Sequence, residues 1–596
     1  MQVFSRPGAG DREVPPHRFH IPVMGTAFTI DTPIKVAKYG IASVISIVDD
    51  DLLERMRAYW SRRSGREYRP IPKDPLADSR ARRIAAYLDL VAALVRQEFE
   101  ALKKAPLRAG SEIVRYLELL PEEARLKRLY RRWQATRSPA VEAAIRSGLR
   151  PGRIEANVMT KVDQPTHHRG RPLPTEMNYA HAAVRGFAES GLEGALCLSA
   201  GMNPRLYSYL ARFKDFFADE AGRIKKEIIL KVSDFRSALT QGKFLAKKGL
   251  WVSEFRVESG LNCGGHTFAT PGILMGPILE EFRRRREELV ATLFGIYRTA
   301  LKKLGKPVPA EPPAQRITAQ GGVGNAFEQR LLLERYGLDS VGWGSPFLLV
   351  PEATVVDDAT RADLAAAGEE DLELSGASPL GVPFNVLKKA TMGQRMHDWY
   401  RSGKPGSPCP KGFLEYNTEY TERPICTASR AYQYRKIREI EARLEGPERK
   451  AAIGRVLERQ CLCVGLAEPA HLSFELEPQM REPAGVSVCP GPNLAYFQGS
   501  YSLEEMVDHI YGRRTLPLDP SRPHMFVKEL RLYRDYLKDL ERGRFGSEKE
   551  QSPAYRRTYL ENLAEGVRYY LAHLEELGLR PWRAELEAAL PAPAPA

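Results

Sequence analysis

Short apolar runs alternate with helix-like segments along two stretches of the chain, 19–48 and 151–342. The runs are rich in β-branched residues and end at glycine, proline or charged residues, which is typical of buried strands. Because they are apolar almost throughout, rather than at every second position, they indicate a parallel sheet covered on both faces. The pattern predicts strands at 19–24, 41–48, 154–161, 195–200, 227–232, 251–258, 316–319 and 338–342.

Helical periodicity fills the segments between these strands. Asp31-Thr32-Pro33 marks a helix start with proline in the first turn, and that helix is expected to end at Gly40. Further helices are predicted at 175–190, from 204 onward, at 235–249, at 277–304 and at 325–336. Eight strands alternating with helices predict the α/β class and a closed (β/α)8 TIM barrel, whose active site lies on the loops after the strands.

Two regions interrupt or follow this alternation. Residues 51–150 are charged and helical in periodicity, so we expect a helical insertion after the second strand. The predicted organisation is 1–50 as the N-terminal part of the barrel, 51–150 as the insertion, 151–350 as the rest of the barrel, and 351–596 as a cysteine-containing, largely helical region. Residues 1–18 and 591–596 are expected to be a disordered lead and a flexible tail.

Composition places the chain among ordinary soluble proteins. Its 596 residues, 43% hydrophobic and 28% charged, are enough for one large barrel with additions. The N-terminus has no apolar h-region, and no apolar run approaches the roughly 18 residues of a membrane helix. We therefore expect a cytoplasmic protein that has no membrane partner.

The net charge of +14 raises the question of nucleic-acid binding, but Lys and Arg are spread widely along the chain. The densest basic run, 283–286, lies in a helical pattern that also carries Glu280, Glu281, Glu287 and Glu288. This arrangement favours a solvated, ion-paired helix face over a phosphate track. Nucleic acid is not expected, whereas an acidic protein partner or an anionic substrate is compatible with the charge.

Glycine-rich loops follow three of the predicted strands. The strand at 251–258 leads into 262–266, where two glycines let a ligand approach the backbone and His266 can handle a proton near neutral pH. A plain glycine turn with a surface histidine is the alternative. The loops 320–329 and 342–347 follow the last two strands, where free backbone N–H groups and a positive helix end favour a phosphate.

Three segments resemble the nitronate monooxygenase (2-nitropropane dioxygenase) family and the related flavin-dependent enoyl-carrier-protein reductases. They are IPVMGT at 21–26, GGH at 264–266, and the run from GGVGNAF to LLVPE at 321–352. These families are FMN-binding TIM barrels, so the resemblance implies a flavin-dependent oxidoreductase. It covers 19–50 and 151–350, and departs from the family at Asn262-Cys263, in the insertion and after residue 350.

The resemblance also implies roles for single residues. Met24 and Gly25 would flank the flavin ring, and Lys231 would approach it and favour a negatively charged reduced ring. His266 and Lys231 would be the catalytic pair. The other implied FMN contacts are Gly264 and Gly265 beside the ring, and Gly321, Gly322, Gly324, Gly344 and Ser345 around the phosphate.

Five of the seven cysteines gather between residues 409 and 489. In a cytoplasmic protein, such a group favours metal binding over disulfide cross-linking. We expect a [4Fe–4S] cluster here, with structural zinc or unliganded buried thiols as the alternatives. The expected ligands are Cys426, Cys461, Cys463 and Cys489, with Cys409 as the alternative ligand. Cys197, inside an apolar run, is expected to lie in the core.

Together these patterns predict an FMN-dependent oxidoreductase whose cluster passes electrons to or from the flavin. Its partners would be a small-molecule substrate and, as a further possibility, a redox protein. One alternative is a nitronate monooxygenase-like or enoyl-reductase-like flavoenzyme without a cluster. Another is a barrel scaffold without flavin that binds RNA or protein through its basic surface.

Overall fold

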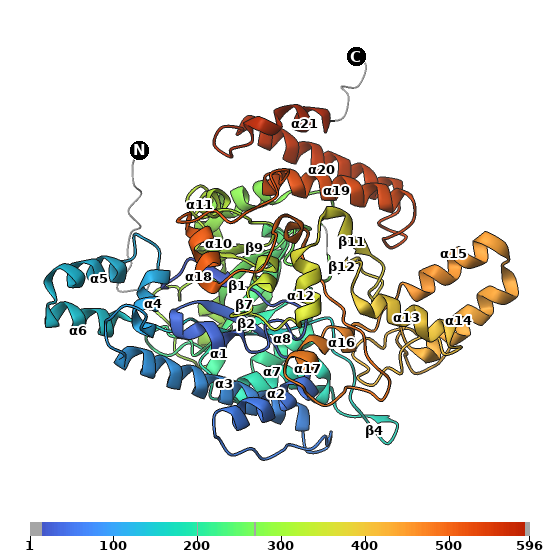
Figure 1. Cartoon of the computed structure of the whole chain (residues 1–596), viewed down its shortest axis with the longest axis horizontal. Coiled ribbons are helices and arrows are strands. Elements are labelled where there is room, and N and C mark those ends of the chain that lie inside the picture. The colour runs from blue at the N-terminus through green and yellow to red at the C-terminus, as the bar shows by residue number, and fades with distance from the viewer. Residues whose placement is uncertain (1–14, 200, 268–269, 591–596) are drawn as a thin grey trace.

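Eight parallel strands close into a barrel at the centre of the molecule (Figure 1). The computed structural model describes residues 15–199, 201–267 and 270–590. Each barrel strand pairs with the next barrel strand along the chain, and the last returns to the first. The strands are β1 (Phe19–Ile21), β2 (Ala42–Ser46), β3 (Ile154–Val158), β6 (Gly194–Leu198), β7 (Lys226–Val232), β8 (Val252–Val257), β9 (Arg316–Gln320) and β10 (Ser340–Gly342). The predicted TIM barrel is confirmed, although Ala200, the end of one expected strand, lies outside the described residues.

Helices follow the strands as the periodicity predicts. The first ends at Gly40, whose φ of 85° is the left-handed conformation common at a helix end. Asn325 caps another, because its side chain accepts a hydrogen bond from the N–H of Glu328. These helices are α1 (Thr32–Val36) with η1 (Ala37–Tyr39), η2 (Thr175–Met177) with α7 (Tyr179–Glu189), α8 (Pro204–Leu210), α9 (Phe235–Ala246), α10 (Met275–Lys303) and α11 (Ala326–Glu334).

The segment between β2 and β3 is helical, as expected. Its longest helix lies against α7, where Arg185 Nη2 and Asp78 Oδ1 are 2.5 Å apart. The segment therefore covers one side of the barrel, and α4 to α6 extend away from it (Figure 1). Its helices are α2 (Asp50–Arg63), α3 (Ser79–Lys104), α4 (Glu112–Leu119), α5 (Arg125–Thr136) and α6 (Pro139–Gly148).

The region after the barrel is largely helical, but it also contains an antiparallel hairpin that the sequence analysis did not predict, β11 (Leu372–Ser375) with β12 (Phe384–Leu387). Two helices, α14 and α15, pack on each other around a small separate core and project outward (Figure 1). The helices are α12 (Asp358–Ala365), α13 (Thr391–Arg401), α14 (Arg430–Arg443), α15 (Gly446–Leu457), α16 (Leu462–Gly465), α17 (Glu468–Ser473), α18 (Leu503–Tyr511), α19 (Met525–Glu541), α20 (Pro553–Ala572) and α21 (Arg583–Ala588).

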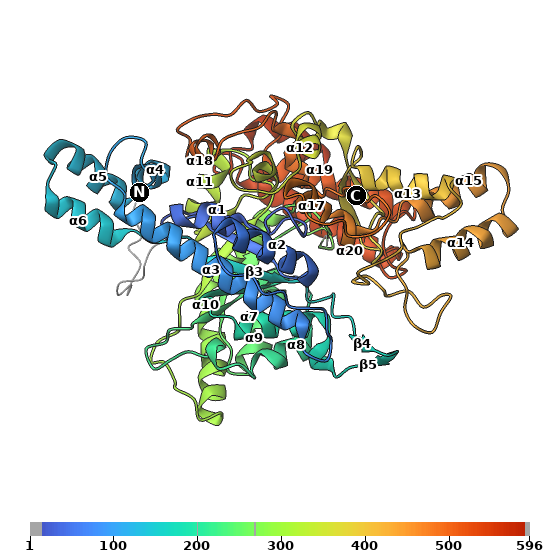
Figure 2. The ribbon, with the colours of Figure 1, turned by 60° about the horizontal axis from the view of Figure 1, so that its bottom comes forward.

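This C-terminal region lies on the loops that follow the strands (Figure 2). The N–H of Ala27, in the loop after β1, donates to the carbonyl of Leu466 over 3.1 Å. The N–H of Thr267, after β8, donates to the carbonyl of Pro383 over 2.9 Å. Since active sites of TIM barrels form at this end, the C-terminal region is positioned to complete the site.

The basic run on α10 is ion-paired, as the sequence predicts. Arg283 lies 2.6 Å from Glu280, and Arg286 lies 2.6 Å from Asp339, measured between nitrogen and oxygen. Arg285 pairs with two further glutamates of the same helix. Within the described ranges, no helix is both long enough and apolar enough to cross a membrane.

The interior of the barrel carries a buried charge network. Arg256 is 1% exposed, and its guanidinium lies 2.9 Å from Glu155 and 2.6 Å from Glu254. Arg153 also contacts both carboxylates. The next layer is small and apolar and includes Cys197, which confirms that this thiol belongs to the core. Burying such a charge pair has a desolvation cost that offsets most of its attraction, but removing one partner leaves an uncompensated buried charge.

Replacing Arg256 by Met should destabilise the protein, because it leaves Glu155 and Glu254 with only Arg153 and the more distant Arg316 as cations. We expect the free energy of unfolding to fall by about 3 kcal/mol, the lower end of the usual cost, since Arg153 remains. Urea denaturation followed by circular dichroism measures this. Arg283→Met on the surface of α10 is the control and should change stability by less than about 0.5 kcal/mol. Equal stabilities for the two variants would contradict the buried network.

Candidate active site

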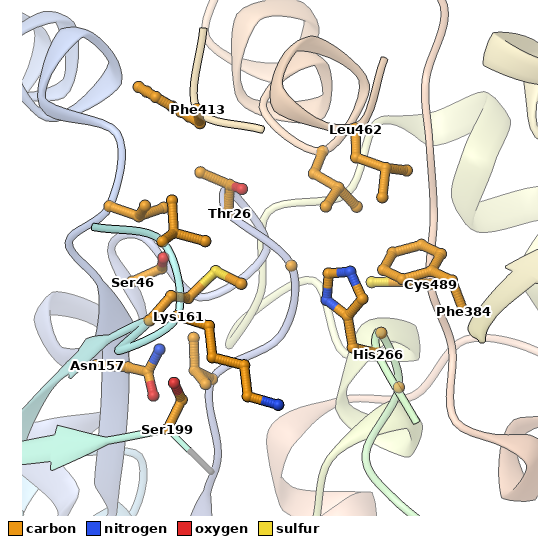
Figure 3. Close-up of a pocket in the computed structure, with 18 of the residues that line it drawn as sticks. Thr26, Ser46, Asn157, Lys161, Ser199, His266, Phe384, Phe413, Leu462 and Cys489 are labelled. Atoms are coloured by element: carbon orange, nitrogen blue, oxygen red, sulfur yellow. The ribbon is translucent and has the colours of Figure 1, made fainter. Parts of the chain in front are cut away.

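A cavity opens at the carboxyl ends of the barrel strands (Figure 3). Its empty volume, counting the part open to solvent, is about 1180 Å³. Strand ends supply a group of polar residues that we call the polar floor, and the C-terminal region supplies most of the apolar wall. The floor consists of Ser46, Asn157, Ser199, Lys231 and Glu258, and the wall includes Leu380, Phe384, Phe413, Leu414, Leu462 and Leu466.

Asn157 is the least satisfied residue of the polar floor. It lies on β3 and is 4% exposed, and its Oδ1 accepts no hydrogen bond from any described residue. A buried amide oxygen without a donor is costly, so an unpaired one beside a cavity indicates a ligand that donates to it. The sequence analysis missed this residue, although a polar side chain near the end of an apolar strand is a signal that could have identified it.

Lys231 supplies a fixed positive charge at the same floor. Its Nζ lies 2.6 Å from Glu258 Oε2, and Gln320 donates to the other Glu258 oxygen over 2.8 Å. Burial works against the charged form, but the carboxylate of Glu258 raises the pKa of Lys231 above its ordinary value. Lys231 is therefore an ammonium at neutral pH, as the predicted role requires.

His266 reaches the cavity from the loop after β8. Its Nε2 lies 2.7 Å from Ser378 Oγ, and its ring packs edge-on against Phe384 with centroids 4.9 Å apart. Burial, and then the charge of Lys161, lower the pKa of His266 to about 4. The imidazole is therefore neutral at pH 7. It can accept a proton or donate its N–H, but it cannot act there as a standing imidazolium.

The loop that carries His266 is shaped by its own asparagine. Asn262 Oδ1 accepts the N–H of Gly264 over 3.0 Å, and its Nδ2 donates to the carbonyl of His266 over 3.0 Å. Asn385 of β12 donates to Asn262 Oδ1 as well. Gly264 has a φ of +120°, and a Cβ there would be 1.9 Å from the carbonyl oxygen of Cys489. Only glycine fits this position.

The residues expected to contact FMN divide into two groups. Gly25, Lys231, Gly264, Gly265 and His266 line the cavity. The second group is not among its lining residues and consists of Met24, Gly321, Gly322, Gly324, Gly344 and Ser345. The neighbours of Met24, Val23 and Gly25, do line the cavity, whereas Met24 itself is 4% exposed and packs in the core.

The two late glycine loops lie on neighbouring strands, as expected, but other parts of the chain pack closely against them. A Cβ on Gly322 would be 2.0 Å from the side chain of Leu261, and one on Gly344 would be 2.6 Å from Cys263. Ser345 Oγ accepts the N–H of Gly491 over 2.6 Å. These glycines are therefore packed against other residues of the chain and do not form an open phosphate-binding loop.

A carboxylate of the chain itself occupies the start of α11. Glu328 is 0% exposed, and its Oε2 accepts the N–H of Gly324 over 2.8 Å. The guanidinium of Arg522 lies 2.8 Å from the same oxygen and donates to the carbonyl of Gly322 over 3.0 Å. Glu328 thus takes the position in which an anion stabilises a helix N-terminus. Sequence reasoning missed this pair because Arg522 lies far along the chain.

The five late cysteines do not come together as expected. Main-chain hydrogen bonds join the segments of Cys409 and Cys426, since the N–H of Ser407 donates to the carbonyl of Ala428 over 3.0 Å. Cys489 instead faces the cavity, beside Gly264 (Figure 3). All seven cysteines are free thiols. Across the described ranges, no group of three or more His, Cys, Asp or Glu side chains is arranged to hold a metal ion.

Comparisons with known proteins add little to this geometry. No family model matches the chain, and no curated protein matches it. Among solved structures, FabK from Thermotoga maritima is 13% identical, with 87% of this chain and 96% of that chain covered and a TM-score of 0.35. The enoyl reductase domain of MlnA from the macrolactin biosynthesis cluster of Bacillus amyloliquefaciens is 16% identical, with 67% and 87% covered and a TM-score of 0.33. Nitroalkane oxidase from Streptomyces ansochromogenes is 11% identical, with 84% and 96% covered and a TM-score of 0.33. Similarities this weak carry no argument about function.

The neutral state of His266 predicts a measurable pH dependence of stability. The unfolded chain binds a proton at this residue below about pH 6.5, whereas the folded protein does so only near pH 4. The contribution of His266 to the free energy of unfolding is therefore retained above pH 6.5 and is lost as the pH drops toward 4. Between pH 7 and pH 5 this loss is at most about 2 kcal/mol. His266→Gln should remove that part of the difference between urea-unfolding free energies at the two pH values. His168→Gln, in the loop after β3, is the control, and an identical pH dependence in both variants would rule the effect out.

Proposed function

We propose that the protein is an FMN-dependent oxidoreductase whose flavin ring lies in the cavity at the barrel mouth. The observation that carries the proposal is the polar floor, where Asn157, whose buried Oδ1 has no donor, and the ammonium of Lys231 line the same cavity as neutral His266. A flavin ring has polar groups along its edges and an apolar body. It therefore matches a cavity with a polar floor and an apolar wall.

Glycines border the cavity where a flat ring would need close contact with backbone. Gly25 has a φ of +52°, and Gly265 has a φ of +79°, where a Cβ would lie 3.8 Å from the ring of Phe384. Substituting either would strain the backbone as well as reduce the space. These positions support a planar ligand held between the loops after β1 and β8.

When bound, FMN supplies electron and hydride transfer. The chain's own residues then have separable tasks. Lys231 holds positive charge near the ring and stabilises negative charge there, while Glu258 keeps it in place. His266, hydrogen-bonded to Ser378, is placed to hold or release one proton at the substrate. The apolar wall from the C-terminal region keeps water away from the reacting groups.

The two late glycine loops stay the predicted phosphate site, although Leu261 and Cys263 pack closely against them. In the described part of the chain, the backbone N–H groups of Gly322, Gly344 and Ser345 donate no hydrogen bond, and such donors suit an anion. Arg522 is the nearby cation. Binding there has to compete with the contacts of Leu261 and Glu328, so the phosphate end supports the proposal less than the ring end does.

Two alternative functions were expected from the sequence, a flavoenzyme without a cluster and a nucleic-acid-binding scaffold, and the structure supports them to different degrees. A small-molecule flavoenzyme without a cluster shares the same cavity, so the choice depends on the cysteines. Cys463 and Cys489 both line this cavity, so two thiols of the late cysteine group would lie close to the proposed flavin. A nucleic-acid-binding scaffold gains no support, because the basic run on α10 is paired with acidic residues.

The substitution Asn157→Leu tests the proposed site of the flavin ring, because it should affect protein stability and FMN affinity in opposite directions. Leucine is nearly isosteric and removes a buried, unpaired oxygen, so the free energy of unfolding should stay the same or rise. The same substitution removes an acceptor for the ligand, so the dissociation constant for FMN should increase about tenfold, or about 1.4 kcal/mol. Urea denaturation and quenching of FMN fluorescence measure the two quantities on the full-length protein.

Arg283→Met serves as the control for binding, since it lies on the outer surface of α10. FMN released from the purified protein by heat should be identified by mass spectrometry. A full-length protein that is colourless and does not quench FMN fluorescence would contradict the proposed function. If Asn157→Leu bound FMN as tightly as the natural sequence, the proposal that the flavin ring lies on the polar floor would be wrong.

A further inference from the structure

The hydroxyl of Ser378, in the turn between β11 and β12, is the partner of His266 in the C-terminal region. Ser378 is 0% exposed and is not among the residues that line the barrel-mouth cavity. Its Oγ has two hydrogen-bond partners among the described residues. One is His266 Nε2, 2.7 Å away, and the other is the N–H of Leu380, 3.2 Å away. The direction of the first bond decides which ring nitrogen of His266 carries the proton.

The donors and acceptors around Ser378 fix that direction. A backbone N–H only donates, so Oγ accepts from Leu380. The hydroxyl proton then needs an acceptor of its own, and in the described part of the chain that acceptor is His266 Nε2. A buried hydroxyl that donated to nothing would destabilise the fold. Ser378 therefore donates to Nε2.

The single proton of the His266 ring consequently lies on Nδ1. Burial lowers the pKa of His266 to about 4, so the ring is neutral and carries one proton at neutral pH. Because Nε2 accepts from Ser378, that proton is on the other nitrogen. The ring stands at the edge of the cavity (Figure 3). Its Nδ1 is thus a hydrogen-bond donor, whereas its one acceptor nitrogen is already engaged.

The β11–β12 hairpin holds the ring in this orientation. The backbone of His266 forms an antiparallel bridge with Phe384, and the N–H of Asn385 donates to the carbonyl of Gly265 over 3.0 Å. The ring of Phe384 packs edge-on against the imidazole with centroids 4.9 Å apart. Backbone and ring are therefore held by the same strand, and Ser378 meets the nitrogen that remains on its side.

The turn that carries Ser378 is held in turn by the segment 458–460. Arg459 Nη1 donates to the carbonyl of Ser378 over 3.1 Å and to the carbonyl of Gly376. The N–H of Gln460 donates to the carbonyl of Ala377 over 2.9 Å. One guanidinium thus joins both ends of the turn, which suits the rigid fork of arginine donors. Arg459 reaches His266 only through Ser378.

We propose that Ser378 and Arg459 are positioning residues that hold His266 with its proton on Nδ1, so that the barrel mouth offers the substrate a hydrogen-bond donor rather than a base. A neutral imidazole that donates can bind an oxygen of the substrate and stabilise negative charge developing there. The substrate that fits carries an acceptor oxygen, such as a carbonyl oxygen, at its reacting end. This role toward a substrate rests on the proposed function, whereas the position of the proton does not.

Nitrogen-15 NMR of the histidine rings tests the proposal on the full-length protein. In protein labelled at histidine, the His266 signals are those lost in His266→Gln. At neutral pH we expect the resonance of a protonated nitrogen for Nδ1 and that of an unprotonated nitrogen for Nε2. Ser378→Ala removes the donor to Nε2, so signals of both tautomers should appear. Arg459→Met frees the turn and should produce the second tautomer to a smaller extent.

Ser375→Ala is the matched control, because Ser375 is a buried serine of the same hairpin whose Oγ donates to the carbonyl of Phe384. It should leave the His266 signals unchanged, and so should Ser378→Thr, which keeps the hydroxyl. Circular dichroism checks that each variant is folded. A proton found on Nε2 in the natural sequence overturns the proposal without any variant. A single unchanged tautomer in folded Ser378→Ala overturns it as well.

FMN is measured in the same samples, so the two proposals can fail separately. Ser378→Ala should bind FMN as tightly as the natural sequence, because Ser378 does not line the cavity. A protein that holds no FMN but has its proton on Nδ1 contradicts the flavin assignment and supports the positioning of His266. A protein that holds FMN but has its proton on Nε2 contradicts only the positioning.

Discussion

A close backbone contact between the barrel and the C-terminal region sets the geometry of the whole site. At Gly264 a side chain of any size would run into the carbonyl oxygen of Cys489, 1.9 Å from where its Cβ would stand. Ser345 and Gly491 add a hydrogen bond of 2.6 Å nearby. Together with the hydrogen bonds from Ala27 to Leu466 and from Thr267 to Pro383, these two contacts hold the later chain on the barrel mouth, where the cavity lies.

The cavity is a joint product of the two parts of the chain. The barrel supplies charge and hydrogen-bonding groups at its strand ends, with Lys231 and Asn157 on the floor. The later chain supplies apolar cover and the hydroxyl of Ser378 that positions His266. Charged groups at the mouth of a barrel would otherwise face water, so this cover strengthens each electrostatic interaction inside. The chemistry proposed for the site depends on both contributions.

The late glycine loops show how one sequence signal can serve two purposes. Glycines before a helix suit a bound phosphate, but they also allow backbone to pack tightly. Here Glu328 lies at the helix start with Arg522 as its partner, and Leu261 packs on Gly322. The chain therefore satisfies internally much of what a phosphate would satisfy. The family resemblance could not reveal this, since Arg522 lies beyond the residues that it covers.

The sequence by itself determined the barrel, because buried parallel strands must be apolar along their whole length and therefore stand out in any linear pattern. The strand pattern also predicted that the His266 loop follows a strand and that Lys231 lies at the end of one, and both residues line the cavity, while their chemical roles stay a prediction. Only the tertiary structure decided that Asn385 and Ser378 hold that loop, and that Arg522 meets Glu328. These contacts join residues roughly a hundred or more positions apart or depend on the turn of a loop, and no local periodicity records which distant side chain a folded loop will meet.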